Sequence, residues 1–198
     1  MEHAAKLCAD LGHEVDEASP DLNLAMLMPA FMAIWTGNLA AIVDFIARLT
    51  GQTPSTDNME GLTLGLYEAG KRVSAGDYLQ AKIMLNQAAR GAAKFHQSRD
   101  LWLTATLGAP PVRLGTFDLE ERDPVKSFAP LIDYVPFTAL QNVTGQPAIN
   151  LPLYWNEAGL PIGVQFAAPF GDELTLLQLA TELERAEPWF ARYATIKI

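Results

Sequence analysis

Hydrophobic side chains recur at helical spacing in two long stretches of the chain. In the first stretch they step by three or four residues through Trp35, Leu39, Ile42, Ile46 and Leu49. In the second they step in the same way through Tyr78, Ala81, Leu85, Ala88, Ala92 and Phe95. Residues at this spacing share one face of an α-helix. We therefore expect two long helices, over Leu22–Leu49 and Ser74–Arg99, whose stripes lie in the core.

Local signals indicate where the helices begin and end. Pro29 predicts a break or a fresh first turn in the first long helix, and Gly51 ends it. Ser74 offers a capping hydroxyl to the second, and Asp77 lies three residues further on to return the bond. Shorter helices are expected at Glu2–Leu11, Asn58–Lys71 and Asp172–Glu187.

Short apolar runs predict strands in the rest of the chain. The main strands are expected at Leu101–Leu107, Gln146–Trp155 and Leu160–Phe166. The turn residues Asn156–Gly159 predict a hairpin between the last two, and we expect all three strands to share one sheet. A weaker strand is expected at His13–Ala18, and the proline-rich Gly108–Pro136 is expected to be a loop.

Composition narrows the class of protein. The chain has 198 residues, of which 49% are hydrophobic and 19% charged, as in a soluble globular domain with a sizeable core. Polar residues and prolines interrupt its apolar stretches, so no membrane span is expected. The net charge of −9 argues against nucleic-acid binding, because phosphate backbones would be repelled. The single cysteine, Cys8, excludes an intrachain disulfide and fits a cytoplasmic location.

The usual arrangements of catalytic residues are not evident from spacing. The three histidines are scattered, so no metal site is predicted, and no phosphate-binding or dinucleotide fingerprint occurs. None of the five serines is flanked by glycine, as a serine nucleophile on a sharp turn generally is. The pair Glu120 and Glu121 lies in a charged loop, which indicates a solvated surface. Spacing alone therefore names no catalytic residue.

Several segments together resemble one family. Asn142–Pro152, which reads Asn-Val-Thr-Gly-Gln-Pro-Ala-Ile-Asn-Leu-Pro, is similar to the N-x-T-G-x-P-A-I-S-L-P run of amidase-signature enzymes. The remaining matches follow the family's order at Leu11–Val15, Tyr67–Tyr78, Gly159–Gln165, Gly171–Glu173 and Glu187–Trp189. A single match of this kind would mean little, but together they span nearly the whole chain. Among the members of this family, general amidases and nylon-oligomer hydrolases are the types that the chain resembles.

The resemblance implies a fold and an activity. It implies an α/β fold, the C-terminal part of the amidase-signature fold, with a mixed β-sheet flanked by helices. Family members hydrolyse small-molecule amides through a serine, a cis-serine and a lysine, without metal or organic cofactor. These residues belong to the family's N-terminal half, and none matches a residue here. Residues 1–198 are therefore expected to form a C-terminal lobe that is inactive alone; the alternative is a non-catalytic amidase-like scaffold or binding protein.

The resemblance also implies that this lobe supplies part of the substrate pocket. Trp35, Thr104 and Phe137 are the candidate substrate-binding residues, because each lies near the end of an apolar element beside a loop. The alternative is that all three are core residues. Two departures from the family pattern either change the pocket or are neutral drift: Thr104-Ala105 replaces a Thr-Pro step, and Asn150 replaces a serine. We also expect an exposed apolar face and self-association through it.

Overall fold

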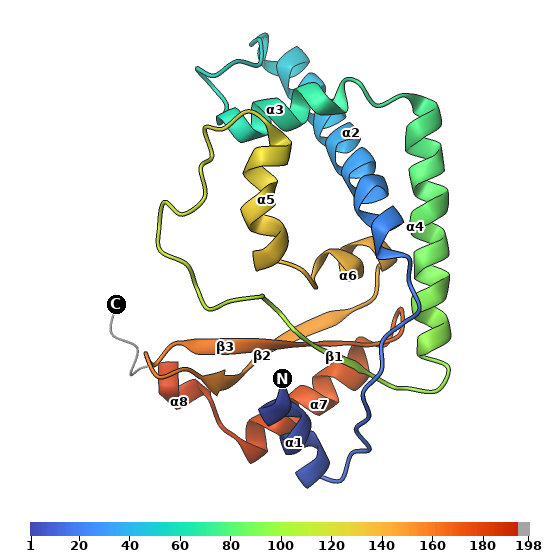
Figure 1. Ribbon diagram of the computed structural model, residues 1–198, viewed down its shortest axis with the longest axis vertical. Coiled ribbons are helices and arrows are strands. Elements are labelled where there is room, and N and C mark those ends of the chain that lie inside the picture. The colour runs from blue at the N-terminus through green and yellow to red at the C-terminus, as the bar shows by residue number, and fades with distance from the viewer. Residues whose placement is uncertain (194–198) are drawn as a thin grey trace. The chain divides into compact units, whose positions relative to one another are not determined.

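The structure is a computed structural model that describes residues 1–193, and the chain divides into two compact units (Figure 1). The sheet unit comprises Met1–Asp21, Arg90–Pro111 and the described residues from Val135 onward. The helical unit comprises Leu22–Ala89 and Val112–Tyr134.

Three strands form the sheet of the first unit. They are β1 (Trp102–Ala105), β2 (Ala148–Trp155) and β3 (Pro161–Ala167), paired antiparallel in the order β1-β3-β2. The prediction that the three strands share one sheet is confirmed, and so is the hairpin between β2 and β3. Its turn is held by Asn156, whose Oδ1 accepts a hydrogen bond from the Leu160 N–H at 2.9 Å. Gly159 has a φ of 76°, which glycine adopts without strain.

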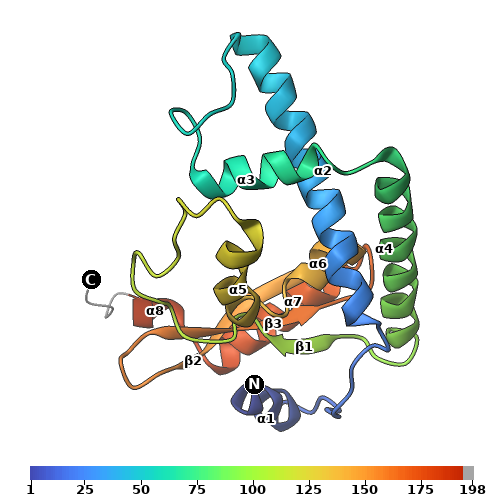
Figure 2. The same cartoon turned by 45° about the horizontal axis from the view of Figure 1, so that its top comes forward.

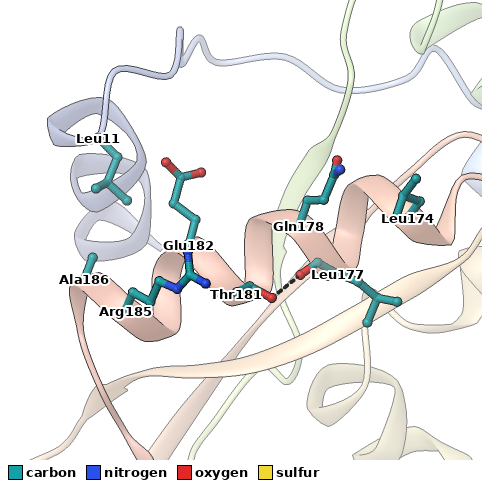
Figure 3. Close-up of a pocket in the computed structure, with 8 residues that line it drawn as sticks. All are labelled: Leu11, Leu174, Leu177, Gln178, Thr181, Glu182, Arg185 and Ala186. Carbon is teal, nitrogen blue, oxygen red and sulfur yellow. Dashed lines mark hydrogen bonds between the residues drawn. The ribbon is translucent and has the colours of Figure 1, made fainter.

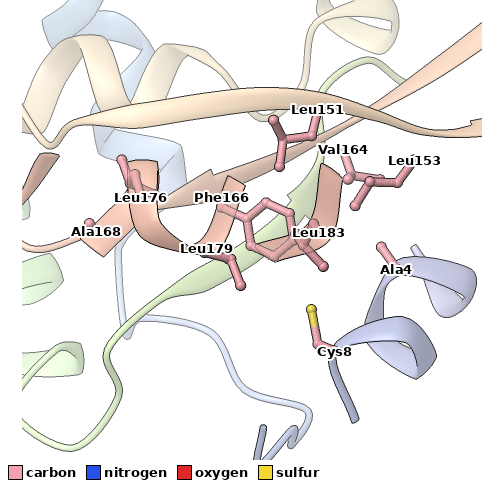
Figure 4. Packing of buried hydrophobic residues seen from close by; sticks show 10 residues of the cluster. All are labelled: Ala4, Cys8, Leu151, Leu153, Val164, Phe166, Ala168, Leu176, Leu179 and Leu183. Atoms are coloured by element: carbon pink, nitrogen blue, oxygen red, sulfur yellow. The ribbon is translucent and has the colours of Figure 1, made fainter. Parts of the chain in front are cut away.

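One face of this sheet carries the main hydrophobic core. In the register of the strands, Phe166 is flanked by Leu103 and Ile149, and Val164 by Ala105 and Leu151. Helices α1 (Glu2–Asp10) and α7 (Glu173–Ala186) cover this face, as Figures 2 and 4 show. The buried side chains of the cluster are Ala4, Cys8, Leu151, Leu153, Val164, Phe166, Ala168, Leu176, Leu179 and Leu183. Burial of each large side chain contributes roughly 1.5–3 kcal/mol.

The helical unit contains α2 (Leu24–Thr50), α3 (Gly61–Gly70), α5 (Pro124–Tyr134) and the first part of α4 (Ala75–Phe95). Small residues let its helices approach closely. A Cβ atom added at Gly70 would overlap the carbonyl oxygen of Thr36 and lie 2.9 Å from the Cβ of Ala40. From Thr36 to the end of α2, the buried residues are Thr36, Ala40 and Val43.

The expectation that the first apolar stripe lies in the core is wrong. Ile42 is 56% exposed and Leu49 is 70% exposed, whereas the buried positions of α2 lie one residue further along the helix. The larger side chains of the stripe would hold α3 away, and the small residues allow the close contact instead. The second stripe is confirmed, because Ala81, Ala88 and Ala92 are buried and its other members are half-buried.

Several predicted boundaries are corrected. Pro29 lies within a continuous α2, and the span Ala25–Thr50 is long and apolar enough to cross a membrane by length and composition. The length and composition of a single helix are weak evidence for a membrane span, since a core helix of a soluble protein passes the same test. The expected loop at Gly108–Pro136 contains α5, and two further short helices follow at Ala139–Thr144 (α6) and Phe190–Tyr193 (α8). No strand forms at residues 13–18.

The predicted capping of the second long helix, α4, by Ser74 is confirmed. Its Oγ accepts a hydrogen bond from the Asp77 N–H at 3.1 Å, and its own N–H donates to Asp77 Oδ2 at 3.2 Å. These bonds satisfy N–H groups that a helix leaves unpaired at its first turn. Hydrogen bonds from Ser74 lower the pKa of the Asp77 carboxyl, because they favour its charged form.

Candidate functional site

The second face of the sheet carries a row of polar side chains. Thr104 on β1, Gln165 on β3 and Asn150 on β2 are register partners, and together they form what we call the polar row. Successive residues of a strand point to opposite faces, so the row faces away from the hydrophobic core. Thr104 and Gln165 are buried, and Asn150 is exposed.

Hydrogen bonds fix the side chains of the polar row and leave one strong acceptor unused. Gln165 Nε2 donates to Thr104 Oγ1 at 3.1 Å, and Thr106 Oγ1 donates to Asn150 Oδ1. Gly163 makes room for the Asn150 amide, which a Cβ atom at that position would overlap. Gln165 Oε1 accepts no hydrogen bond from any described residue. The row can therefore accept a hydrogen bond from a polar group placed over this face.

Helix α6 leads into β2 through a junction built around Gln146. The Nε2 of Gln146 donates to the Ala168 carbonyl oxygen at 3.2 Å and lies 2.7 Å from His96 Nε2, while its Oε1 accepts from Thr144 Oγ1 at 3.0 Å. His96 Nδ1 lies 3.0 Å from the carbonyl oxygen of Arg99, so this nitrogen carries the proton and Nε2 is the acceptor. Every polar atom of the Gln146 side chain is thus used to fix α6 relative to the sheet.

The structure places two of the predicted pocket residues in the sheet unit and one in the helical unit. Thr104 is a member of the polar row, and Phe137 lies half-buried in the turn that precedes α6, so both belong to the sheet unit. Trp35 belongs to the helical unit, where its ring packs edge-on against Phe128 with centroids 5.2 Å apart. The role of these three residues in a substrate pocket stays a prediction.

Two hollows lie elsewhere on the sheet unit. The larger, of about 770 Å³, lies over the outer face of α7 and the end of α1, and it includes Leu11, Leu174 and Leu177 (Figure 3). The other, of about 520 Å³, lies between residues 19–21 and the α4 side chains Arg90 and Lys94. Neither is lined by a predicted pocket residue.

A charged cluster in the helical unit involves Lys71, which lies within the Tyr67–Tyr78 segment that resembles the family. Asp44 accepts hydrogen bonds from Lys71 Nζ at 2.5 Å and from the Tyr67 hydroxyl at 2.8 Å. The bond from Lys71, followed by that from Tyr67, lowers the pKa of the Asp44 carboxyl. The same carboxylate raises the pKa of Lys71 and that of Tyr67. Lys71 is therefore held in its charged form and is unsuited to act as a general base.

The described residues contain no arrangement of a serine nucleophile and a base. Within residues 1–193 no serine hydroxyl is hydrogen-bonded to a lysine: Ser74 pairs with Asp77, and Ser127 donates to the Glu121 carbonyl oxygen. In the same range no group of histidine, cysteine and carboxylate side chains is placed to hold a metal ion. Burial raises the pKa of the Cys8 thiol, which makes it a weak nucleophile.

Sequence reasoning named Thr104 and Asn150 as positions that concern the pocket but missed Gln165 and the row that joins the three residues. Alternation along the strands was the signal that could have found it, because Thr104, Asn150 and Gln165 each stand between apolar neighbours. The glycines and prolines of the motif indicate bends between strands and say nothing about which side chains lie next to each other across the sheet.

The sheet, its flanking helices and the ordered motifs define an amidase-like class of protein, and comparisons agree. The family model described as "Amidase" matches residues 1–177. A putative amidase AmiC of Mycobacterium leprae is 37% identical over 187 residues, covering 94% of this chain and 39% of the relative. The 6-aminohexanoate-cyclic-dimer hydrolase of Pseudomonas sp. (strain NK87) is 30% identical over 197 residues, covering 96% and 40%.

Solved structures agree with the sequence comparisons. A 6-aminohexanoate cyclic dimer hydrolase complexed with substrate superimposes with a TM-score of 0.85 and 29% identity, over 96% of this chain and 41% of that one. A bacterial aryl acylamidase of the amidase-signature family shares the fold at a TM-score of 0.77 and 19% identity, over 98% and 40%. The chain belongs to the amidase family, and its fold is that of the C-terminal portion of amidase-signature enzymes. It spans about two fifths of the length of these relatives.

Proposed function

We propose that this chain is the C-terminal lobe of an enzyme that hydrolyses carboxylic amide bonds. In this proposal the serine, cis-serine and lysine lie in a part of the enzyme outside residues 1–198. The lobe contributes the sheet scaffold and part of the substrate pocket. The observation that carries the proposal is the family match over residues 1–177 in a chain that spans about two fifths of its relatives. The hydrogen bonding of the described serines and lysines supports it, because none forms a nucleophile with its base.

The proposed substrate is a small-molecule amide, with Trp35, Thr104 and Phe137 lining the pocket. Two relatives are named for the 6-aminohexanoate cyclic dimer, and one from Enterococcus faecalis is named a lipoamidase. These names suggest amides with flexible aliphatic chains as the first compounds to test. Self-association through the exposed stripe of α2 and a cytoplasmic location belong to the same proposal.

The test combines this chain with the segment that its relative has in addition. The purified chain is assayed on an aryl amide and on the 6-aminohexanoate cyclic dimer, alone and together with the complementary segment of the NK87 hydrolase. We expect no hydrolysis from the chain alone. We expect hydrolysis from the mixture, abolished by a serine-directed fluorophosphonate. Hydrolysis by the chain alone would contradict the proposal, and a stable but inactive complex would favour the non-catalytic scaffold.

A further inference from the structure

The face of the sheet that carries the polar row holds an asparagine with a fixed side chain and an unused donor. Asn150 is exposed, but Thr106 Oγ1 donates a hydrogen bond to its Oδ1. Its amide also lies against Gly163, where an added Cβ atom would overlap Oδ1 and come within 3.1 Å of Nδ2. The Nδ2 itself donates to no group within residues 1–193. Because the side chain is already held in place, an acceptor that binds its N–H groups costs little further rotamer entropy.

The register partner of Asn150 on β3, Gln165, adds an acceptor beside this donor. Gln165 is 5% exposed, its Nε2 is bonded to Thr104, and its Oε1 accepts no hydrogen bond from any described residue. The Oε1 is not enclosed by the fold, since the enclosed side-chain atoms without a partner in residues 1–193 are the amide of Gln141 on α6 and Trp155 Nε1. A group that lies over the polar row can therefore reach it. Pairing an acceptor on a nearly buried side chain is favourable, because such groups in native proteins are rarely left unpaired.

The chemistry of the two atoms defines the class of ligand. The side chains of the polar row and of Thr106 are all neutral, so an ion would lose its hydration there without gaining a counter-charge. A carboxamide is complementary, because its carbonyl oxygen accepts from Asn150 Nδ2–H and its N–H donates to Gln165 Oε1. An ester can form only the first of these bonds. We propose that the polar row binds a neutral amide group through Asn150 and Gln165.

The position of Asn150 makes it the residue that sets this chain apart from the family pattern. The amidase-signature run has a serine where this chain has Asn150, and a serine hydroxyl is shorter and offers a single donor. The side chain lies on the face of the sheet opposite the hydrophobic core, and α6 lies on that side as well (Figures 1 and 2). Asn150 is thus accessible from the side that the core helices leave open.

The amide group can come from two sources. It is either an amide of the small-molecule substrate, in which case the inference rests on the proposed function, or a backbone amide of the enzyme's remaining segment. The side-chain N–H signals of Asn150 in the ¹⁵N-labelled chain report either contact directly. Asn86, which is exposed on α4, gives control signals of the same kind in the same spectrum.

The labelled chain is titrated with N-propylhexanamide and, separately, with the complementary segment of the NK87 hydrolase. A saturable shift of the Asn150 signals with N-propylhexanamide, without a shift of the Asn86 signals, identifies a small-molecule amide as the ligand. A shift that only the segment produces identifies a backbone amide. If the Asn150 signals shift with neither, the proposal is overturned.

Two substitutions test the hydrogen bond from Asn150. Asn150→Asp keeps an oxygen for Thr106 and removes the donor, so the dissociation constant of the partner identified above should rise about fivefold, as expected for one lost hydrogen bond. Asn86→Asp makes the same change of charge and should leave the constant unchanged. Asn150→Ser removes the N–H groups without adding a charge and should give a similar loss. Wild-type affinity in Asn150→Ser, or equal effects of the two aspartate variants, would refute the role of Asn150.

The second hydrogen bond is tested with an ester. Propyl hexanoate lacks the N–H group, so it should bind the wild-type chain about fivefold more weakly than N-propylhexanamide. Gln165→Met removes the acceptor and should abolish this preference, with the urea midpoint as a check on folding. A preference for the amide that survives in folded Gln165→Met would show that Gln165 does not bind the N–H. Should Gln165→Met fail to fold, the variants at the exposed Asn150 still decide the proposal.

The outcomes for the polar row and for the proposed function are distinguishable, because none of these measurements requires hydrolysis. If the mixture with the complementary segment forms but hydrolyses nothing, the proposed function fails, and the Asn150 signals still show whether an amide binds. If the mixture is active and the Asn150 variants bind as the wild type does, the inference about the polar row fails and the function stands.

Discussion

The sheet unit and the helical unit are stabilised by different kinds of side chain. In the sheet unit, large apolar side chains such as Phe166 and Leu183 fill the space between one face of the sheet and two helices. In the helical unit, the contact between α2 and α3 is made by Thr36, Ala40 and Gly70, while large apolar side chains of α2 are exposed. Burial of apolar surface is the main stabilising contribution in the sheet unit. In the helical unit, close approach of the α2 and α3 backbones determines how the helices pack.

The difference shows what an apolar stripe can and cannot establish. A stripe at helical spacing correctly indicates that α2 is a helix. The stripe does not establish which face of the helix is buried. Small residues can form the contact with a neighbouring helix while large apolar side chains remain exposed. The stripe of α2 is such a case, since Ile42, Ile46 and Leu49 are exposed in this chain.

The largest effect is expected in the core of the sheet unit. Leu183 is fully buried, so Leu183→Ala should lower the free energy of unfolding by about 2–5 kcal/mol, through lost burial and the cavity left behind. Leu177 on the same helix is 59% exposed, and Leu177→Ala is the matched control. Urea unfolding followed by circular dichroism measures both. Equal losses would show that α7 is not oriented as described.

Close packing in the helical unit is tested by adding one methyl group. Gly70→Ala places a Cβ against the Thr36 carbonyl and should destabilise the unit by about 3 kcal/mol. Gly76→Ala is the control, since only the Ser74 hydroxyl lies near that position, at 3.6 Å. It should be neutral or slightly stabilising, because alanine favours a helix. Hydrogen exchange in α2 and α3 reports the loss; an unchanged exchange rate for Gly70→Ala would contradict the close contact.

Neighbouring residues of α2 give a smaller and more discriminating test. Val43 is buried and Ile42 is 56% exposed. Val43→Ala should cost about 1–2 kcal/mol, and Ile42→Ala should cost less than about 0.5 kcal/mol in the separate chain. Light scattering on Ile42→Ala should also show weaker self-association, if the stripe mediates it. A larger loss of stability from Ile42→Ala than from Val43→Ala would show that the face of α2 that carries Ile42 is the buried one.

Sequence patterns predicted the sheet well because several signals agreed there. The apolar runs and the Asn156–Gly159 turn both specify local structure, and the strands have one compatible register. The helix α5 was missed because Pro124 and Pro130 argue for a loop when read singly. Proline is compatible with the first position of a helix, and tertiary contacts stabilise the remaining turns.

The candidate site was predictable only in part. Thr104 was named from its place at the end of an apolar strand. Its partner Gln165 lies 61 residues away, and the register that joins them is not a local property of the sequence. The buried state of Gln141 was equally out of reach, since an amide on a short helix is usually solvated.

The smallest effect concerns the charged cluster of the helical unit, and it is separated from the others by its dependence on pH. Lys71 and Tyr67 lower the pKa of Asp44 in the folded protein, so the contribution of this carboxylate is present above its unfolded pKa of about 4. The contribution is lost as the pH falls through the lower, folded value. The raised pKa of Lys71 adds a second limit: its contribution is present below about pH 10 and is lost as the pH rises through the folded value.

Asp44→Asn should therefore reduce stability between these limits and approach the wild-type protein at both ends. The reduction should be small and should shrink in high salt, because the pair is partly exposed and screened. Asp57→Asn, at an exposed aspartate whose side chain makes no hydrogen bond within residues 1–193, is the control. The urea midpoint of the three proteins is measured across the pH range at low and high salt. A difference between Asp44→Asn and wild type that persists unchanged at strongly acidic pH would mean that Asp44 acts through packing and not through its charge.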